Sequence, residues 1–386
     1  MLPDARRAAV VDAIHAHLLT SDPTSTGDRR RVLAAVREGH PLLSDADVAA
    51  VASAVTARAT GLGPLETILL DPSVSEVMVN GTGPVWIERH GRLEATDLHI
   101  PHSDVELLIE RIVAPLGLRA DRSSPIADAR LADGSRVNVI VPPLAIDGPC
   151  LTIRRFGARA VPLDELCPPG VEALLAWAVL GHANVMVSGG TGAGKTTLLN
   201  ALGALLPRTE RLVTVEDTAE LRLPGDHVVR LEARPATADG LGVITIRQLV
   251  RNALRMRPDR LLVGEVRGAE AVDMLWAMNT GHEGSLSTCH ANSPVDALRR
   301  LEVMVLSAGL DLPLDAVRDQ LTAALDLVVH VARLEGGRRG VVAVHEVLDP
   351  PAPSRTRPLA DADGLHQLPL RPPRRPVPAA DTRWCR

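Results

Sequence analysis

The pattern of hydrophobic and polar positions changes character near residue 60. Over residues 1–60 apolar residues recur at helical spacing, and Pro23 and Gly27 break the pattern at Ser21–Gly27. Residues 61–156 instead carry short apolar runs separated by turn residues, with one amphipathic stretch at 104–116. We therefore predict an N-terminal helical segment followed by a small α+β domain. Its strands are expected at 77–79, 85–87, 137–141 and 151–153.

Strand and helix patterns alternate from residue 171 onward. Apolar runs of strand length are followed by stretches of helix length. This order predicts an α/β domain with a mostly parallel sheet and helices on both faces. The helix after Thr245 is the most clearly defined, because Thr245 and Gln248 form a capping-box pattern. Helices are expected at 171–180, 195–206, 246–256 and 269–278, and strands at 185–187, 211–215, 261–263 and 285–288.

Two stretches rich in proline divide the chain further. Residues 157–170 contain Pro162, Pro168 and Pro169 and are predicted to form a linker. Residues 351–386 are rich in Pro and Arg and poor in apolar residues, which is typical of a disordered tail. The predicted organisation is a helical segment (1–60), a small α+β domain (61–156), a linker (157–170), an α/β domain (171–350) and a tail (351–386).

Composition argues against several function classes. The 386 residues carry a formal net charge of -5 and only 1% aromatic residues. A nucleic-acid binder that neutralises many phosphates or stacks bases on aromatic rings is therefore not expected. The four cysteines show no Cys-x-x-Cys spacing, so neither a zinc module nor a disulfide framework is predicted. Apolar runs are short and interrupted by polar residues, which predicts a cytoplasmic protein whose membrane contact is peripheral.

One segment carries the signature of a phosphate-binding loop. Gly189–Thr196 reads GGTGAGKT between a predicted strand and a predicted helix, which is the Walker A pattern in its required context. Its glycines let backbone N–H groups turn toward phosphate oxygens, and the helix that begins at Lys195 adds its positive dipole end. The alternative is a glycine-rich turn with an exposed lysine. Nucleotide contacts are predicted for Gly189, Gly190, Thr191, Gly192, Ala193, Gly194, Lys195, Thr196 and Thr197.

Lys195 and Thr196 have specific expected roles in binding Mg-ATP. Of the 42 Lys and Arg residues, Lys195 is the single lysine, which indicates that a compact ammonium group is needed at this position. We expect it to bridge the β- and γ-phosphates. The Thr196 hydroxyl is expected to ligate Mg²⁺.

Two carboxylates at predicted strand ends are candidates for the chemistry. Glu265 ends the apolar strand that begins at residue 261 and is predicted to orient and deprotonate the attacking water. Glu216 follows the strand 211–215 and is predicted to assist through Mg²⁺ or its waters. Gly264 stands where the usual Walker B pattern has an aspartate, and Asp259 lies at the opposite end of the strand. The alternative for both glutamates is a solvent-facing charge at a strand end.

Two histidines flank the predicted strand 285–288. His282 precedes this strand and His290 follows it. We predict that both sense the γ-phosphate of the nucleotide. Packed structural histidines and a zinc site are the alternatives, and a zinc site would need a further ligand cluster.

Four segments follow one another in the order found in a known family. They read GGTGAGKTT, VTVEDTAEL, RPDRLLVGEVRGAEA and TGHEGSLSTCHANS. In this order they resemble the Walker A motif, aspartate box, Walker B motif and histidine box of type II and type IV secretion ATPases. Two earlier segments, SEVMVNGTGPVWIERHGRLE and SPIADARLADGSRVNVIVPPLAIDGPCLTIRRF, resemble the N-terminal domain of the Tad/Cpa branch, which assembles Flp-type pili. The resemblance covers roughly residues 60–348.

This resemblance implies a fold, an activity and partners. Family members are RecA-like ATPases that form cytoplasmic homohexameric rings, dock on an inner-membrane platform protein and use Mg-ATP to move pilins or secreted substrates. By resemblance the chain is a motor for pilus assembly or protein secretion at the inner face of the cell membrane. It lacks the tetracysteine zinc insertion common in the type II and pilus-extension branches, which favours the Tad or conjugation-like branches.

The resemblance also implies roles for arginines of the smaller domain. Arg130, Arg136, Arg154 and Arg155 match family arginines that reach the nucleotide phosphates, the first two in catalysis and the last two in binding. Guanidinium groups suit such contacts because they can donate two parallel hydrogen bonds. Solvated surface charges are the alternative for all four. Arg267, just after Glu265, is a weaker candidate.

Two other function classes stay open on the sequence. A hexameric nucleic-acid translocase or conjugal-transfer ATPase also combines a P-loop with a ring, and DNA-stimulated hydrolysis would indicate it. A nucleotide-dependent scaffold with little turnover is the third class. Glu265 and the two histidines favour hydrolysis over a scaffold.

Overall fold

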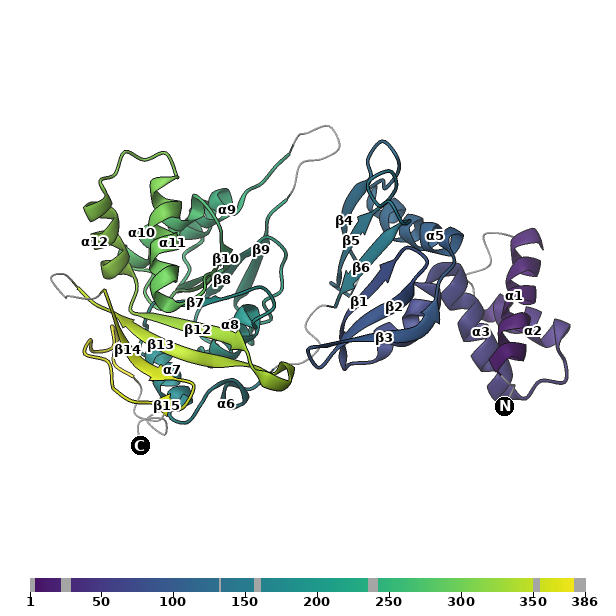
Figure 1. The fold of residues 1–386 in the computed structure, drawn as a ribbon, viewed down its shortest axis with the longest axis horizontal. Coiled ribbons are helices and arrows are strands. Elements are labelled where there is room, and N and C mark those ends of the chain that lie inside the picture. The colour runs from purple at the N-terminus through teal and green to yellow at the C-terminus, as the bar shows by residue number, and fades with distance from the viewer. Residues whose placement is uncertain are drawn as a thin grey trace. The chain divides into compact units, whose positions relative to one another are not determined.

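The chain folds into two compact units, Met1–Ala158 and Arg159–Arg386. Figure 1 shows a computed structural model, which describes residues 4–21, 29–131, 133–155, 161–234, 242–349 and 355–377. The division falls inside the stretch 157–170 that was predicted as a linker. Each unit has its own hydrophobic cores.

The first unit begins with three helices that share a small core. α1 (Asp4–Ser21), α2 (Arg29–Gly39) and α3 (Asp45–Thr60) agree with the helical spacing of this segment. They pack around buried aliphatic residues such as Val32, Val36 and Val51. The predicted break at Ser21–Gly27 lies, apart from Ser21, outside the described residues.

A six-stranded antiparallel sheet forms the rest of the first unit. Its strand order is β3-β2-β1-β6-β5-β4, and buried alternate residues of its strands share one core with α5 (His102–Val113). The helix α5 and the short helix α4 (Glu66–Leu70) pack against the core of this antiparallel sheet, which matches the predicted α+β class. The strands are β1 (Val74–Asn80), β2 (Pro84–Arg89), β3 (Arg92–His99), β4 (Ile126–Arg130), β5 (Arg136–Ile140) and β6 (Cys150–Arg154).

The second unit is built on a nine-stranded sheet of order β15-β14-β13-β12-β7-β11-β10-β8-β9. The six strands from β12 to β9 pair in parallel, as predicted, and β13 to β15 extend one side in antiparallel pairs. The strands are β7 (Val185–Gly189), β8 (Leu212–Glu216), β9 (Val228–Glu232), β10 (Arg260–Val266), β11 (Leu286–His290), β12 (Leu327–Arg333), β13 (Arg339–Val347), β14 (Thr356–Asp361) and β15 (Gly364–Leu365).

Helices cover both faces of this sheet, because alternate strand residues enter two different cores (Figure 1). Met186 and Val263 face α9 to α12, whereas Val185 and Leu262 face α6 to α8. The capping box of Thr245 and Gln248 at the start of α9 is confirmed. The helices are α6 (Leu163–Leu166), α7 (Val171–Leu180), α8 (Lys195–Gly203), α9 (Ile246–Ala253), α10 (Glu270–Asn279), α11 (Pro294–Leu306) and α12 (Leu314–Ala324).

Two predictions about irregular segments are corrected. The stretch predicted as a linker contains the short helix α6, whose Leu163 and Leu166 are buried in the core of the second unit. The disordered-tail prediction for 351–386 is wrong for 355–377, since β14 and β15 complete the sheet there and Leu359 is fully buried. Within the described residues, no helix has both the length and the apolar character needed to cross a membrane.

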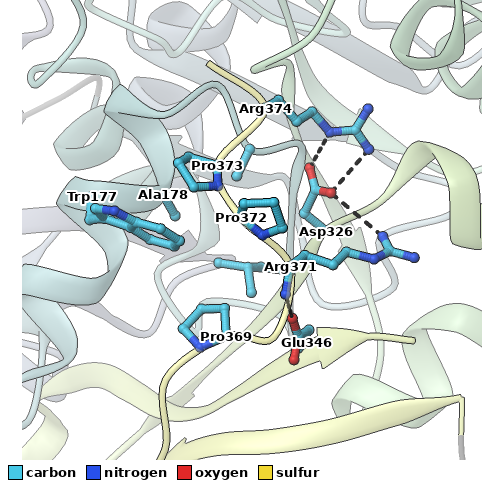
Figure 2. A pocket seen from close by; sticks show the side chains of 11 residues that line it. Trp177, Ala178, Asp326, Glu346, Pro369, Arg371, Pro372, Pro373 and Arg374 are labelled. Carbon is cyan, nitrogen blue, oxygen red and sulfur yellow. Dashed lines mark hydrogen bonds and ion pairs between the residues drawn. The ribbon is translucent and has the colours of Figure 1, made fainter. Parts of the chain in front are cut away.

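Residues 366–377, which we name the C-terminal strap, are held by buried carboxylates of the second unit (Figure 2). The backbone N–H groups of Leu370 and Arg371 both donate to Glu346, whose carboxylate is almost fully buried, at 2.8 Å. Arg374 donates to both oxygens of Asp326 at 2.6 and 3.0 Å. Prolines and arginines are typical of disorder only where no such partners exist.

The strap yields a stability prediction with a matched control. Arg374→Ala should destabilise the second unit by about 2–3 kcal/mol, because it removes a charged partner from the mostly buried Asp326. Arg375→Ala removes the same charge from the next residue, but its contact with Glu283 is half exposed. That control should cost less than about 1 kcal/mol. Urea unfolding of the two variants checks this, and equal losses would contradict the assigned role of Asp326.

Candidate nucleotide-binding site

The loop between β7 and α8 has the backbone that the Walker A pattern predicts. Gly192 and Gly194 adopt left-handed φ angles of 68° and 101°, which glycine adopts without strain. α8 begins at Lys195, as predicted, so the N–H groups of its first turn face the loop. The predicted contact residues Gly190, Thr191 and Ala193 lie within this loop, and Thr196 and Thr197 lie in the first turn of α8. The loop therefore fits a phosphate chain.

Lys195 lies inside the loop rather than on the surface. Lys195 is only 8% exposed. Its ammonium group donates hydrogen bonds to the carbonyl oxygens of Gly189 and Gly190 at 3.1 and 3.0 Å. The same nitrogen is 3.3 Å from Nε2 of His290. The alternative of an exposed lysine on a glycine-rich turn does not describe this geometry.

Glu265 lies at the carboxyl end of β10 and contacts His290. Its Oε1 is 2.9 Å from Nε2 of His290, and its Oε2 accepts a hydrogen bond from Arg267 at 2.8 Å. Burial raises the pKa of Glu265, but Arg267, His290 and Lys195 together bring this pKa below its ordinary value. The carboxylate is therefore ionised at neutral pH. The structure thus brings together Lys195, His290 and Glu265, which the sequence had singled out separately.

His290 connects the lysine and the glutamate in an uncharged form. Burial first, and then the positive charge of Lys195, lower the pKa of His290 below its ordinary value. Nε2 of His290 lies 2.9 Å from Oε1 of Glu265, but the geometry of this contact is not that of a hydrogen bond. The positive charge of Lys195 also acts on Glu265 directly and lowers the pKa of its carboxyl group.

Glu216 lies in a network of backbone hydrogen bonds, and its assistance through Mg²⁺ or its waters stays a prediction. It is 3% exposed, and its carboxylate accepts hydrogen bonds from the backbone N–H groups of Glu220 at 2.8 Å and Leu221 at 3.0 and 3.2 Å. It also lies against Gly264, where an added Cβ would be 2.7 Å from Cγ of Glu216. Glu216 therefore fixes the segment after β8 and occupies the space beside Gly264.

His282 lies at the opposite edge of the sheet from the loop. It precedes β11, whereas His290 ends that strand, so about 15 Å of strand separates them. Of the two histidines only His290 joins the loop cluster, and γ-phosphate sensing by either histidine stays a prediction. The two histidines also cannot share a zinc ion. Among the described residues, no group of three or more His, Cys, Asp or Glu could hold a metal ion.

The four predicted arginines of the first unit divide into two groups. Arg130, Arg136 and Arg154 are direct cross-strand neighbours on β4, β5 and β6, and Glu76 of β1 continues this row. Arg155 instead donates to backbone carbonyl oxygens of residues 71 and 74, at 2.9 Å for the latter. Its guanidinium group therefore holds the start of β1, and phosphate binding by Arg155 stays a prediction.

Comparison with known proteins identifies relatives over most of the chain. The type II/IV secretion system protein family model matches residues 58–348. A candidate conjugal transfer protein of Mycobacterium tuberculosis (strain H37Rv) is 40% identical over 316 residues, covering 78% of this chain and 89% of the relative. The conjugal transfer protein TrbB of Rhizobium radiobacter is 35% identical, covering 71% and 84%. The type IV secretion system protein PtlH of Bordetella pertussis is 36% identical, covering 70% and 89%.

Solved structures share the fold. The ATPase DotB of Legionella pneumophila is 22% identical with a TM-score of 0.53, covering 70% of this chain and 76% of its own. The pilus retraction motor PilT, solved with bound ADP, is 21% identical with a TM-score of 0.54, covering 73% and 81%. At these identities the likeness concerns the fold alone.

The burial of Glu216 predicts a pH-dependent stability. Burial, with the charge of Glu220, raises the pKa of Glu216 from 4.5 to about 7. The backbone hydrogen bonds from Glu220 and Leu221 and the charge of Arg230 lower this pKa, but by less. Between these pH values the folded protein keeps a proton that the unfolded chain releases, so stability falls as the pH rises. The free energy of unfolding of the wild type, relative to Glu216→Gln, should fall by about 1.4 kcal/mol per pH unit in this window.

Urea unfolding of both proteins from pH 4.5 to pH 8 tests this linkage. The comparison with Glu216→Gln cancels the titration of all other groups, because only one carboxyl differs between the two proteins. A difference that does not change with pH would show that Glu216 is ionised throughout.

Proposed function

The chain belongs to the type II/IV secretion system protein family, a family of secretion ATPases, and on this premise we propose that it hydrolyses Mg-ATP to drive pilus assembly or protein secretion. The observation that carries this proposal is the contact series from Lys195 through His290 to Glu265. It joins a phosphate-binding loop to an ionised carboxylate at a neighbouring strand end. This arrangement supports turnover rather than a scaffold role.

In the proposed reaction Lys195 binds the β- and γ-phosphates, and the loop N–H groups hold the phosphate oxygens. Thr196, in the first turn of α8, is the residue that would hold Mg²⁺, which when bound supplies charge neutralisation at the phosphates. Glu265 orients a water molecule toward the γ-phosphorus and receives its proton. The water oxygen bonds to that phosphorus, and the bond from the phosphorus to the oxygen it shares with the β-phosphate breaks. ADP retains the electron pair of the broken bond, and the γ-phosphoryl group leaves as inorganic phosphate.

The proposed machine is a homohexameric ring in the cytoplasm that docks on a platform protein at the inner face of the cell membrane. The N-terminal segments that resemble the Tad/Cpa branch support pilus assembly as its process. The arginine row of the first unit supports a role for Arg130, Arg136 and Arg154 as phosphate contacts, because guanidinium groups can donate two parallel hydrogen bonds to phosphate oxygens.

Conjugal transfer is a second candidate process, and one specific observation favours it. Two of the relatives above are named for conjugal transfer. The low aromatic content and the net charge of -5 argue against direct movement of nucleic acid by this chain. ATPase assays with and without single-stranded and double-stranded DNA separate the two classes, since only a nucleic-acid translocase would be stimulated.

Glu265→Gln should separate nucleotide binding from hydrolysis. The amide keeps the size of the side chain but cannot accept a proton, so single-turnover hydrolysis should fall by about 10²–10⁴-fold while ATP still binds. Asp315→Asn, which changes an exposed carboxylate on α12, is the matched control and should keep the wild-type rate. Lys195→Ala should weaken ATP binding by at least about 30-fold. Near-normal turnover in Glu265→Gln would remove the proposed base.

The ring is tested by sedimentation velocity at micromolar protein with Mg-ATP, with Mg-ADP and without nucleotide. We expect a six-subunit species that Mg-ATP promotes, because a contact with the third phosphate stabilises one arrangement over the other. A monomer under all three conditions would contradict the hexamer while leaving the nucleotide site intact.

A further inference from the structure

The antiparallel hairpin of β12 and β13 covers one side of the phosphate-binding loop. A Cβ added to Gly189 would lie 2.5 Å from the carbonyl oxygen of Val331 in β12. β12 pairs in parallel with β7, the strand that leads into the loop, so the carboxyl end of β12 reaches the edge where nucleotide is proposed to bind. The turn between β12 and β13 therefore lies beside the loop.

Two arginines of this hairpin contact the loop glycines. Nη2 of Arg333 is 3.3 Å from the position that a Cβ would take on Gly192. The Cβ and Cδ atoms of Arg339 are both 3.3 Å from the corresponding position on Gly194. The aliphatic part of Arg339 thus packs on the loop backbone at Gly194, and the guanidinium group of Arg333 lies beside Gly192.

The two arginines are also directly opposite each other in the hairpin register. Both residues lie against the loop that is proposed to hold the phosphate chain. Guanidinium groups are well suited to phosphate oxygens, because they can donate two parallel hydrogen bonds. Sequence reasoning missed both residues, because no motif marks them.

The sheet order decides which end of a nucleotide this pair would meet. β12 lies on one side of β7, and β11 with His290 lies on the other, followed by β10 with Glu265. The pair therefore approaches the loop from the side opposite to the cluster that is proposed to act on the γ-phosphate. Resting on the proposed function, we propose that Arg333 and Arg339 bind the nucleotide at its α-phosphate and ribose end.

This assignment makes the pair a determinant of nucleotide affinity and not of the chemical step. The α-phosphate and ribose are common to ATP and ADP, so both nucleotides should depend on the pair equally. The rate at saturating ATP should not depend on it. These two expectations distinguish the pair from a γ-phosphate sensor.

The test uses the full chain with the double variant Arg333→Ala, Arg339→Ala. Calorimetric titration with Mg-ATP and with Mg-ADP should show a loss of affinity of about 10- to 100-fold for both, as expected for charge-assisted hydrogen bonds. The matched control is Arg338→Ala, an exposed arginine of the same turn, which should keep wild-type affinity. The turnover of the double variant at saturating ATP should match that of the wild type. The melting temperatures of the wild type, the double variant and Arg338→Ala check that each protein is folded.

Three outcomes would overturn the assignment. The first is a double variant that binds both nucleotides as tightly as Arg338→Ala does. The second is a double variant that loses affinity for Mg-ATP but not for Mg-ADP. The third is a double variant with unchanged affinities and a lower turnover at saturating ATP. Failure of the proposed function itself looks different, because the wild type would then bind no nucleotide, or Lys195→Ala would bind as the wild type does. Replacing both residues by lysine should restore part of the affinity, since the charge is kept.

Discussion

The ammonium group of Lys195 is the charge around which the candidate site is arranged. It is buried, surrounded by loop carbonyl oxygens, and adjacent to His290, which contacts Glu265. Removing an ammonium group from water is costly unless polar groups surround it. The loop and the ends of β11 and β10 must therefore meet at one place. Parallel pairing of β7, β11 and β10 achieves this, because their carboxyl ends share one edge.

The opposite edge of the same sheet is held by ion pairs. Arg260, at the start of β10, is fully buried and donates to both oxygens of Glu210, just before β8. Although burial opposes it, hydrogen bonds from His182 and Arg260 hold the pKa of Glu210 at about 2. Asp326, just before β12, accepts hydrogen bonds from Arg374 of the C-terminal strap. These contacts fix where β8, β10 and β12 begin. Because the strands pair in a fixed register, the positions of their carboxyl ends beside the loop are fixed as well.

Local patterns were sufficient for the loop, the start of α8 and the capping box of α9, because each depends on residues a few positions apart. Glu265 was predictable for the same reason, since it follows directly from the end of an apolar strand. The roles of Arg155 and the strap were not predictable, because their partners lie far away in the sequence: Arg155 holds residues 71 and 74, and Arg374 holds Asp326. The separation of His282 from His290 was predictable, because one precedes and the other ends the same strand.

Gly264 and Glu216 explain a departure from the usual Walker B pattern. A side chain at position 264 would lie 2.7 Å from Cγ of Glu216, so this backbone accommodates Glu216 or a side chain at 264 but not both. The space beside Gly264 is therefore filled by the side chain of Glu216 from the neighbouring strand β8. Because Glu216 also accepts N–H groups of Glu220 and Leu221, it orders the segment after β8 as well, which an aspartate at position 264 could not do from β10. Gly264 thus leaves the room that the buried side chain of Glu216 occupies.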